Sequence, residues 1–154
     1  MINVVVDSSV AIKWFVVEPY SDEARTILNG YKSGEINLLA PDLMSAEVGN
    51  IVWKKHRLQN LDVEDAQAII DTFKTIGFIF TPNRALLSEA YNLAVTHDRT
   101  VYDMMYVALS KQENCQFITA DERMVNAIGT HFPEVVWIAN WHNPVKENQQ
   151  ESNE

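Results

Sequence analysis

Positive charge is scarce in this sequence of 154 residues. Its 12 Lys and Arg residues face 21 Asp and Glu residues, which gives a formal net charge of -9. A protein that binds DNA or RNA through phosphate neutralisation alone usually carries the opposite sign. The charge therefore argues against a plain nucleic-acid-binding module. It leaves open a protein whose acids hold metal ions, because bound cations would reverse the local sign.

Disulfides and long apolar segments are also missing. The single cysteine, Cys115, excludes an internal disulfide, and the segment Gln116-Phe117-Ile118 that follows it indicates the start of a buried strand, not a reactive thiol. The segment 1–7 has no basic stretch and ends in an acid, unlike a signal peptide. No apolar stretch approaches the ~20 residues that span a membrane. We expect a cytoplasmic protein without membrane association.

Several familiar phosphate sites are absent as well. The chain contains no GxxxxGK[ST] or GxGxxG segment, which leaves nucleotide binding through a Gly-rich loop unsupported. A phosphatase of the haloacid dehalogenase type needs a second Asp two residues after the first, where this chain has Ser9. A receiver-domain phosphoacceptor needs an acidic pair at the end of the first strand, where only Asp7 lies. The four histidines show no HxH or HxxxH spacing.

Short β-branched runs alternate with longer segments whose apolar residues recur at helical spacing. The first pattern predicts strands and the second predicts helices. Strands separated by helices favour right-handed crossovers and a mostly parallel sheet, and we expect a three-layer α/β/α sandwich. The expected strands are 2–6, 36–40, 77–81, 116–119 and 135–138, and the expected helices begin near residues 9, 20, 42, 62, 83, 100 and 121.

Length and composition suit one domain. Hydrophobic residues make up 47% and charged residues 21%, so the chain can bury a substantial core. We expect this domain to span residues 1–142. The segment 143–154 is polar and has no apolar periodicity after Val145, which predicts a solvated or disordered tail.

Four acids fall at or near the expected carboxyl ends of the strands, where parallel α/β sheets form their sites. Asp7 and Asp121 follow the first and fourth strands, Asp103 lies in the first turn of an apolar helix, and Glu47 lies in the helix after the second strand. Taken singly, the aspartates could be helix caps and Glu47 an exposed glutamate. Together they favour a divalent-metal site, because clustered carboxylates repel one another without a cation. Such hard oxygen ligands suit Mg²⁺ or Mn²⁺ and do not suit zinc.

The segments that carry these acids are Val6–Ser9, Ser45–Asn50, Tyr102–Leu109 and Ile118–Asp121. They resemble the four acidic motifs of PIN-domain ribonucleases, and their order and spacing are most similar to VapC-type toxins of type II toxin–antitoxin pairs. The resemblance covers roughly residues 1–140. The YD..YVAL stretch is its most specific part, although methionines follow the Asp where smaller residues are often seen.

The resemblance implies a PIN-like sandwich that cleaves RNA phosphodiester bonds as a metal-dependent endoribonuclease, with Mg²⁺ or Mn²⁺ as cofactor. It also implies an RNA substrate, a cognate antitoxin protein and a homodimer. The alternatives are a housekeeping RNA-processing PIN nuclease and a non-catalytic PIN-like protein-interaction module. By position, the catalytic and metal-binding residues would be Asp7, Glu47, Asp103 and Asp121, supported by Ser9, Asn50 and Thr119.

RNA binding would fall to basic residues outside the acidic quartet. A solvated helix C-terminus explains the run at 54–57 equally well, since the helix dipole favours basic residues there. Trp14, Phe15 and Tyr20 fit either a dimer contact or the core. The RNA-binding candidates are Lys13, Lys54, Lys55, Arg57, Arg99 and Arg123, with His56 inside the same run.

Overall fold

The computed structural model describes residues 1–153. Its centre is a parallel sheet of five strands: β1 Ile2–Val6, β2 Ile36–Pro41, β3 Ile79–Thr81, β4 Gln116–Thr119 and β5 Val135–Trp137. Their order in space is β3–β2–β1–β4–β5, and every pairing is parallel. Helices separate all consecutive strands, so each crossover returns the chain to the same end of the sheet. The strands expected from the sequence are confirmed.

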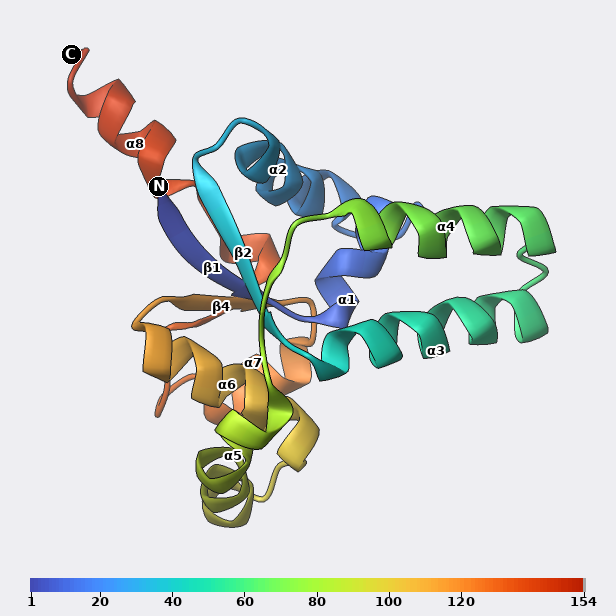
Figure 1. Cartoon of the computed structure of the whole chain (residues 1–154). Helices are drawn as coiled ribbons and strands as arrows, with labels where there is room; N and C mark the ends of the chain where they lie inside the picture. The colour runs from blue at the N-terminus through green and yellow to red at the C-terminus, as the bar shows by residue number, and fades with distance from the viewer. Residues whose placement is uncertain (154) are drawn as a thin grey trace.

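The described residues form eight α-helices: α1 Ser8–Ala11, α2 Ser21–Lys32, α3 Leu43–Leu58, α4 Val63–Thr75, α5 Asn83–His97, α6 Val101–Glu113, α7 Glu122–Ile128 and α8 Pro144–Glu151. Two 3-10 turns, η1 Ile12–Trp14 and η2 Ile138–Asn140, follow α1 and β5. The strand order places α1 and α2 on one face of the sheet and α5, α6 and α7 on the other (Figure 1). This is the three-layer sandwich that the sequence predicts.

Helix α6 is the most deeply packed helix. It contacts β1, β2 and β4 on one side and α5 on the other. Every residue from Met104 to Ser110 is buried, which explains why this helix is apolar on several faces. Because α6 leads into the start of β4, its first turn lies at the carboxyl edge of the sheet.

Helices α3 and α4 form an antiparallel hairpin that extends away from the sheet (Figure 1). Only Ile69 and Phe73 are buried in α4. Trp53 near the end of α3 is 55% exposed. Much of the hairpin surface therefore lies outside the core. No helix within residues 1–153 is long and apolar enough to cross a membrane.

Asp7 caps the first helix, which is one of the alternatives that the sequence left open, because its side chain accepts a hydrogen bond from Val10 N. One segment differs from the sequence expectation. In the tail, residues that we expected to lack regular structure form α8, with Asn143 as its cap and Pro next to it. None of the α8 residues is buried. The helix is thus solvated, and the domain boundary near residue 142 stays a prediction.

Candidate active site

The four acids gather at the carboxyl edge of the sheet. Asp7 directly follows β1, and Asp121 follows the adjacent strand β4. Glu47 lies on α3, which begins just after β2, the other neighbour of β1. Asp103 lies in the first turn of α6, at the same edge. The sequence prediction that these residues lie near one another is supported by their mutual effects on pKa, described below.

Asp7 is the most enclosed of the four, with 8% of its surface exposed. Its Oδ2 accepts a hydrogen bond from Thr119 Oγ1 at 2.6 Å, and its Oδ1 accepts one from the hydroxyl of Ser9. Ser9 Oγ in turn accepts a hydrogen bond from Ala120 N at 3.1 Å. These bonds join the end of β1 to the end of β4 and hold the Asp7 carboxylate in one orientation.

Burial and mutual repulsion raise the pKa values of three of the acids. Burial raises the pKa of Asp7 from 3.8 to about 6, although the hydrogen bonds from Ser9 and Thr119 oppose this. Burial also raises the pKa of Glu47, with further increases from the charges of Asp7 and Asp103. The pKa of Asp103 is raised by burial, lowered by Arg99 and raised again by Asp121. Asp7, Glu47 and Asp103 thus lie within electrostatic reach of one another, and Asp121 lies within reach of Asp103.

Tyr106 orients Glu47. Its hydroxyl, three residues beyond Asp103 on α6, donates a hydrogen bond to Glu47 Oε1 on α3. Burial and the charge of Glu47 raise the pKa of Tyr106, so the phenol stays protonated and remains a donor. Its ring stacks on Phe117 of β4 at 5.4 Å between centroids. We assigned Tyr106 no role from the sequence, although its spacing from Asp103 places both on one face of α6.

Asp103 and Asp121 also take part in helix caps, as the structural alternative predicts. Thr100 Oγ1 accepts a hydrogen bond from Asp103 N at 3.1 Å, while the Asp103 carboxylate lies 3.5 Å from Arg99 Nη2. Asp121 Oδ1 accepts a hydrogen bond from Met124 N at 3.1 Å and caps α7. Capping and membership in an acidic cluster are therefore compatible at both positions.

The donor chemistry of the site fits a hard divalent cation. Four carboxylates supply the oxygen ligands that Mg²⁺ and Mn²⁺ prefer. Yet in the part of the chain that the structure describes, no three Asp, Glu, His or Cys side chains are arranged to hold one ion. Each carboxylate has a hydrogen-bond or ion-pair partner of its own. Coordination of one ion by three of these acids therefore calls for rotation of at least one of their side chains.

A model of the PIN domain family matches residues 4–128 of the chain. The chain belongs to the PIN-domain family. It is similar to Ribonuclease VapC3 of Pyrobaculum aerophilum, with 29% identity over 138 residues that cover 87% of this chain and 98% of that protein. It is also similar to Ribonuclease VapC1 of Mycobacterium tuberculosis, with 31% identity over 90 residues that cover 58% of this chain and 67% of that protein.

Two solved structures share the PIN-domain architecture. One is the crystal structure of PAE2754 from Pyrobaculum aerophilum, with a TM-score of 0.66, 20% identity and coverage of 90% of this chain and 85% of that one. The other is Mycobacterium tuberculosis VapC20, described as a sarcin–ricin loop cleaving toxin, with a TM-score of 0.60, 15% identity and coverage of 86% and 98%. At these identities the likeness supports the fold alone.

Two of the three polar residues that we matched to the PIN-domain motifs contact an acid. Ser9 and Thr119 both donate hydrogen bonds to Asp7. Asn50 is exposed on α3, three residues after Glu47, and within the described residues its side chain forms no hydrogen bond with the quartet. A supporting role for Asn50 stays a prediction.

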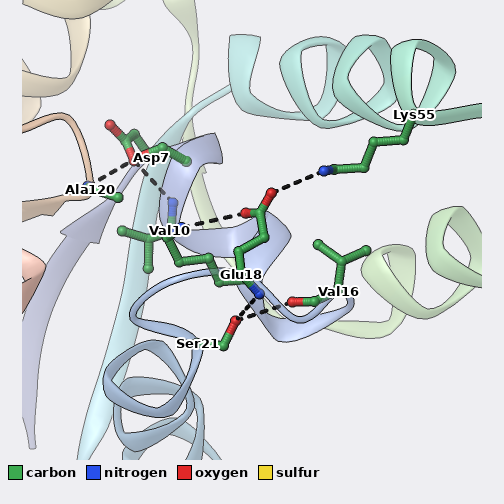
Figure 2. Close-up of polar contacts among 9 residues, drawn as sticks. Asp7, Val10, Val16, Glu18, Ser21, Lys55 and Ala120 are labelled. Atoms are coloured by element: carbon green, nitrogen blue, oxygen red, sulfur yellow. Dashed lines mark hydrogen bonds and ion pairs between the residues drawn. The ribbon is translucent and has the colours of Figure 1, made fainter. Parts of the chain in front are cut away.

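The basic residues that the sequence suggests for RNA binding fall into two groups, those paired with a carboxylate and those exposed. Lys13 is buried, and both Lys13 and Lys55 pair with Glu18, at 3.4 and 2.9 Å (Figure 2). Arg99 pairs with Asp103. These three cations therefore already have carboxylate partners. The exposed candidates are Lys54, Arg57 and Arg123, together with His56.

The structure also places two other residues that the sequence analysis singled out. Trp14, a candidate for a dimer contact, is 8% exposed and donates a hydrogen bond from Nε1 to the Ala24 carbonyl at 2.8 Å, so it belongs to the core. Cys115 is half-buried directly before β4, where the sequence predicts the start of a buried strand. Burial raises the pKa of its thiol to about 11, which keeps it protonated at neutral pH.

Proposed function

We propose that the protein is an endoribonuclease that hydrolyses RNA phosphodiester bonds with Mg²⁺ or Mn²⁺. Its catalytic site would be Asp7, Glu47, Asp103 and Asp121. One observation carries the proposal: acids from four chain regions lie at the carboxyl edge of a PIN-domain sheet, and burial together with the charges of neighbouring acids raises the pKa values of three of them, Asp7, Glu47 and Asp103. The names of the VapC relatives, which describe ribonucleases, support RNA as the substrate.

The side chains of the site suit this reaction. A divalent ion, when bound, lowers the pKa of a water and stabilises charge on the scissile phosphate. Asp7 would be the least mobile ligand, because Ser9 and Thr119 hold both of its oxygens. Tyr106 would present one oxygen of Glu47 and leave the other for coordination. With carboxylates in these roles, the reaction needs no covalent protein nucleophile.

The decisive experiment compares wild type with Asp7→Asn on a panel of structured RNAs, with Mg²⁺, Mn²⁺ or EDTA, followed by mapping of the cleaved ends. We expect discrete cleavage sites with either ion, and none with EDTA or with Asp7→Asn. Asp71→Asn, an equivalent change at an exposed position of α4, is the matched control and should cleave normally. Equal cleavage in excess EDTA, or by Asp7→Asn, would exclude the metal-nuclease mechanism.

We further propose that the protein is the toxin of a toxin–antitoxin pair and acts in the cytoplasm, where its RNA substrate would be found. The similarity to VapC proteins supports this assignment over a housekeeping nuclease. Between α3 and α4 lies a groove of about 240 Å³ whose lining includes Val52, Trp53 and Ile70, and it offers an apolar surface to an antitoxin. Expression alone should arrest growth, and co-expression of a small protein from the adjacent gene should restore it.

A homodimer is the assembly that we propose, with α5 as its surface. Leu87, Tyr91 and Val95 recur every four residues on this helix and are 49%, 58% and 67% exposed. Such an apolar stripe is costly to leave in water and is typical of an interface. Light scattering after size exclusion should give a dimer mass for wild type and a monomer mass for Tyr91→Arg.

A further inference from the structure

Arg99 is the cation held by the acidic site. It lies in the turn between α5 and α6, and its Nη2 is 3.5 Å from Asp103 Oδ2, one helical turn further along. Among the ion pairs within residues 1–153, this is the one that includes an acid of the quartet. The side chains of Arg99 and Asp103 are 25% and 34% exposed, so water screens the pair only in part.

The pairing of Arg99 is incomplete. A guanidinium can form two parallel hydrogen bonds with a carboxylate or a phosphate, but here one nitrogen approaches one oxygen at a distance too long for a strong hydrogen bond. The Arg99 Nε atom is buried and has no hydrogen-bond partner in the described chain. The Arg99 side chain therefore has hydrogen-bonding capacity that its contact with Asp103 does not use.

A metal ion held by Asp103 would compete with Arg99 for this carboxylate. Asp103 is one of the proposed ligands, and the charge of Arg99 stabilises its ionised form. An ion bound to Asp103 neutralises that carboxylate and weakens its attraction for the guanidinium. Arg99 would then be a free cation beside the metal site, where the phosphate of an RNA substrate would lie.

We propose that Arg99 is a phosphate-binding residue that exchanges anions: it pairs with Asp103 in the metal-free protein and with a phosphate of RNA once metal is bound. The inference rests on the proposed function and adds an order of binding to it. Metal loading both reduces the negative charge of the site and releases Arg99, which explains how a chain with a net charge of -9 recruits RNA. The anion that Arg99 binds is either the scissile phosphate or the neighbouring phosphodiester of the RNA, each of which offers two oxygens to a guanidinium.

A purely structural ion pair that closes the α5–α6 turn makes a different prediction. In that case Arg99→Gln would lower the melting temperature and weaken metal and RNA binding together. The exchange model predicts changes of opposite sign, tighter metal binding and weaker RNA binding. The two models are therefore separable by binding measurements on the full chain.

The first measurement is calorimetric titration of Mn²⁺ alone into the metal-free protein. Arg99→Gln should bind Mn²⁺ about threefold to tenfold more tightly than wild type, because the competing charge is gone. Arg99→Lys keeps the charge and should bind Mn²⁺ like wild type. Arg84→Gln, an exposed change in the first turn of α5, is the matched control and should have no effect. Unchanged or weaker Mn²⁺ binding by a folded Arg99→Gln overturns the inference.

The second measurement is the affinity for a labelled single-stranded RNA in EDTA and in Ca²⁺, with gel analysis to show that the RNA stays intact. Arg99→Gln should lose about tenfold in affinity in Ca²⁺ and less than twofold in EDTA. Equal losses under both conditions overturn the inference. Failure of wild type to bind Mn²⁺ would instead overturn the proposed function, and the inference with it. Circular dichroism and the Arg99→Lys variant separate loss of folding from loss of the guanidinium.

Discussion

The hydroxyl of Tyr106 on α6 donates a hydrogen bond to the carboxylate of Glu47 on α3, across 59 positions of sequence. This contact links the deepest helix of one layer to the hairpin that extends from the sheet. It also keeps one oxygen of Glu47 occupied while the carboxylate remains half-buried among other acids. Tyr106 therefore controls both the direction and the protonation of Glu47.

Tyr106→Phe tests this relationship. The hydrogen bond lowers the pKa of Glu47, while burial and the charges of Asp7 and Asp103 raise it. Removal of the hydroxyl therefore raises the pKa further, and a larger fraction of Glu47 is protonated at a given pH. We expect the acid limb of the pH profile of kcat/KM to move to higher pH and the rate at neutral pH to fall about tenfold. An unchanged acid limb would show that the Tyr106 hydroxyl does not affect the ionisation of Glu47.

Asp7→Asn should inactivate the protein and stabilise its metal-free form. The folded-state pKa of Asp7, about 6, lies above the ordinary value of 3.8. The folded state therefore binds this proton more tightly than the unfolded state, and the ionised carboxylate reduces stability increasingly from about pH 4 to above pH 6. Asn is neutral and nearly isosteric, so at pH 7.5 it should add about 1–3 kcal/mol to the free energy of unfolding.

The check is urea unfolding of wild type and Asp7→Asn in EDTA at pH 7.5 and pH 4. The stabilisation should be present at pH 7.5 and should largely disappear at pH 4, where wild-type Asp7 is protonated. Asp71→Asn provides the control for removal of one acid from an exposed helix. A lower stability of Asp7→Asn at pH 7.5 would mean that its hydrogen bonds outweigh the cost of the buried charge.

Metal addition should stabilise the wild-type fold. Ligation to the native state alone raises the free energy of unfolding by about 2.7 kcal/mol when the free ion is at 100 times its Kd. The gain should increase with pH, because the ligands with raised pKa values must lose protons to bind. Thermal melts with Mn²⁺, Mg²⁺ and EDTA at pH 6 and pH 8 measure it. Asp7→Asn should lose most of the gain, and an equal gain in that variant would place the ion elsewhere.

The fold could be predicted from the sequence because hydrophobic periodicity identifies each strand and helix locally. Strands that alternate with helices then form a parallel sheet covered on both faces. The strand that ends in Asp7 and the strand before Asp121 were recognisable, and parallel strands share one carboxyl edge. The helix that carries Asp103 was recognisable as buried because it is apolar on several faces. The positions of the acids near one another followed from these features.

The ion-pair partners of the charged side chains could not be predicted from the sequence. The pairing of Lys13 and Lys55 with Glu18 joins a short 3-10 turn, a loop and a long helix, and no sequence spacing reports such a contact. The helical tail after Asn143 was missed because it buries nothing and therefore has no apolar periodicity. Composition alone does not distinguish a capped, solvated helix from a disordered segment.

Glu18 holds two lysines, and its removal should destabilise the protein. Its carboxylate accepts hydrogen bonds from Lys13 and Lys55, and its backbone N donates to Ser21 Oγ at 2.9 Å (Figure 2). Lys13 is buried, so Glu18→Gln leaves an ammonium without a counter-charge in a shielded place. We expect a loss of about 1–3 kcal/mol in the free energy of unfolding.

The pH dependence of this loss identifies its cause. Burial opposes ionisation of Glu18, but the hydrogen bond and charge of Lys55 and the charge of Lys13 hold its pKa below the ordinary value of 4.5. The ion pairs therefore stabilise the fold above pH 4.5, and this contribution disappears as the pH falls through the lower folded-state pKa. Urea unfolding over a series of pH values below 4.5 should show the stabilities of wild type and Glu18→Gln converging as the pH falls. Asp22→Asn removes the exposed pair with Arg25 and should change stability by less than about 0.5 kcal/mol. A Glu18→Gln deficit that does not shrink as the pH falls would assign the loss to packing instead of charge.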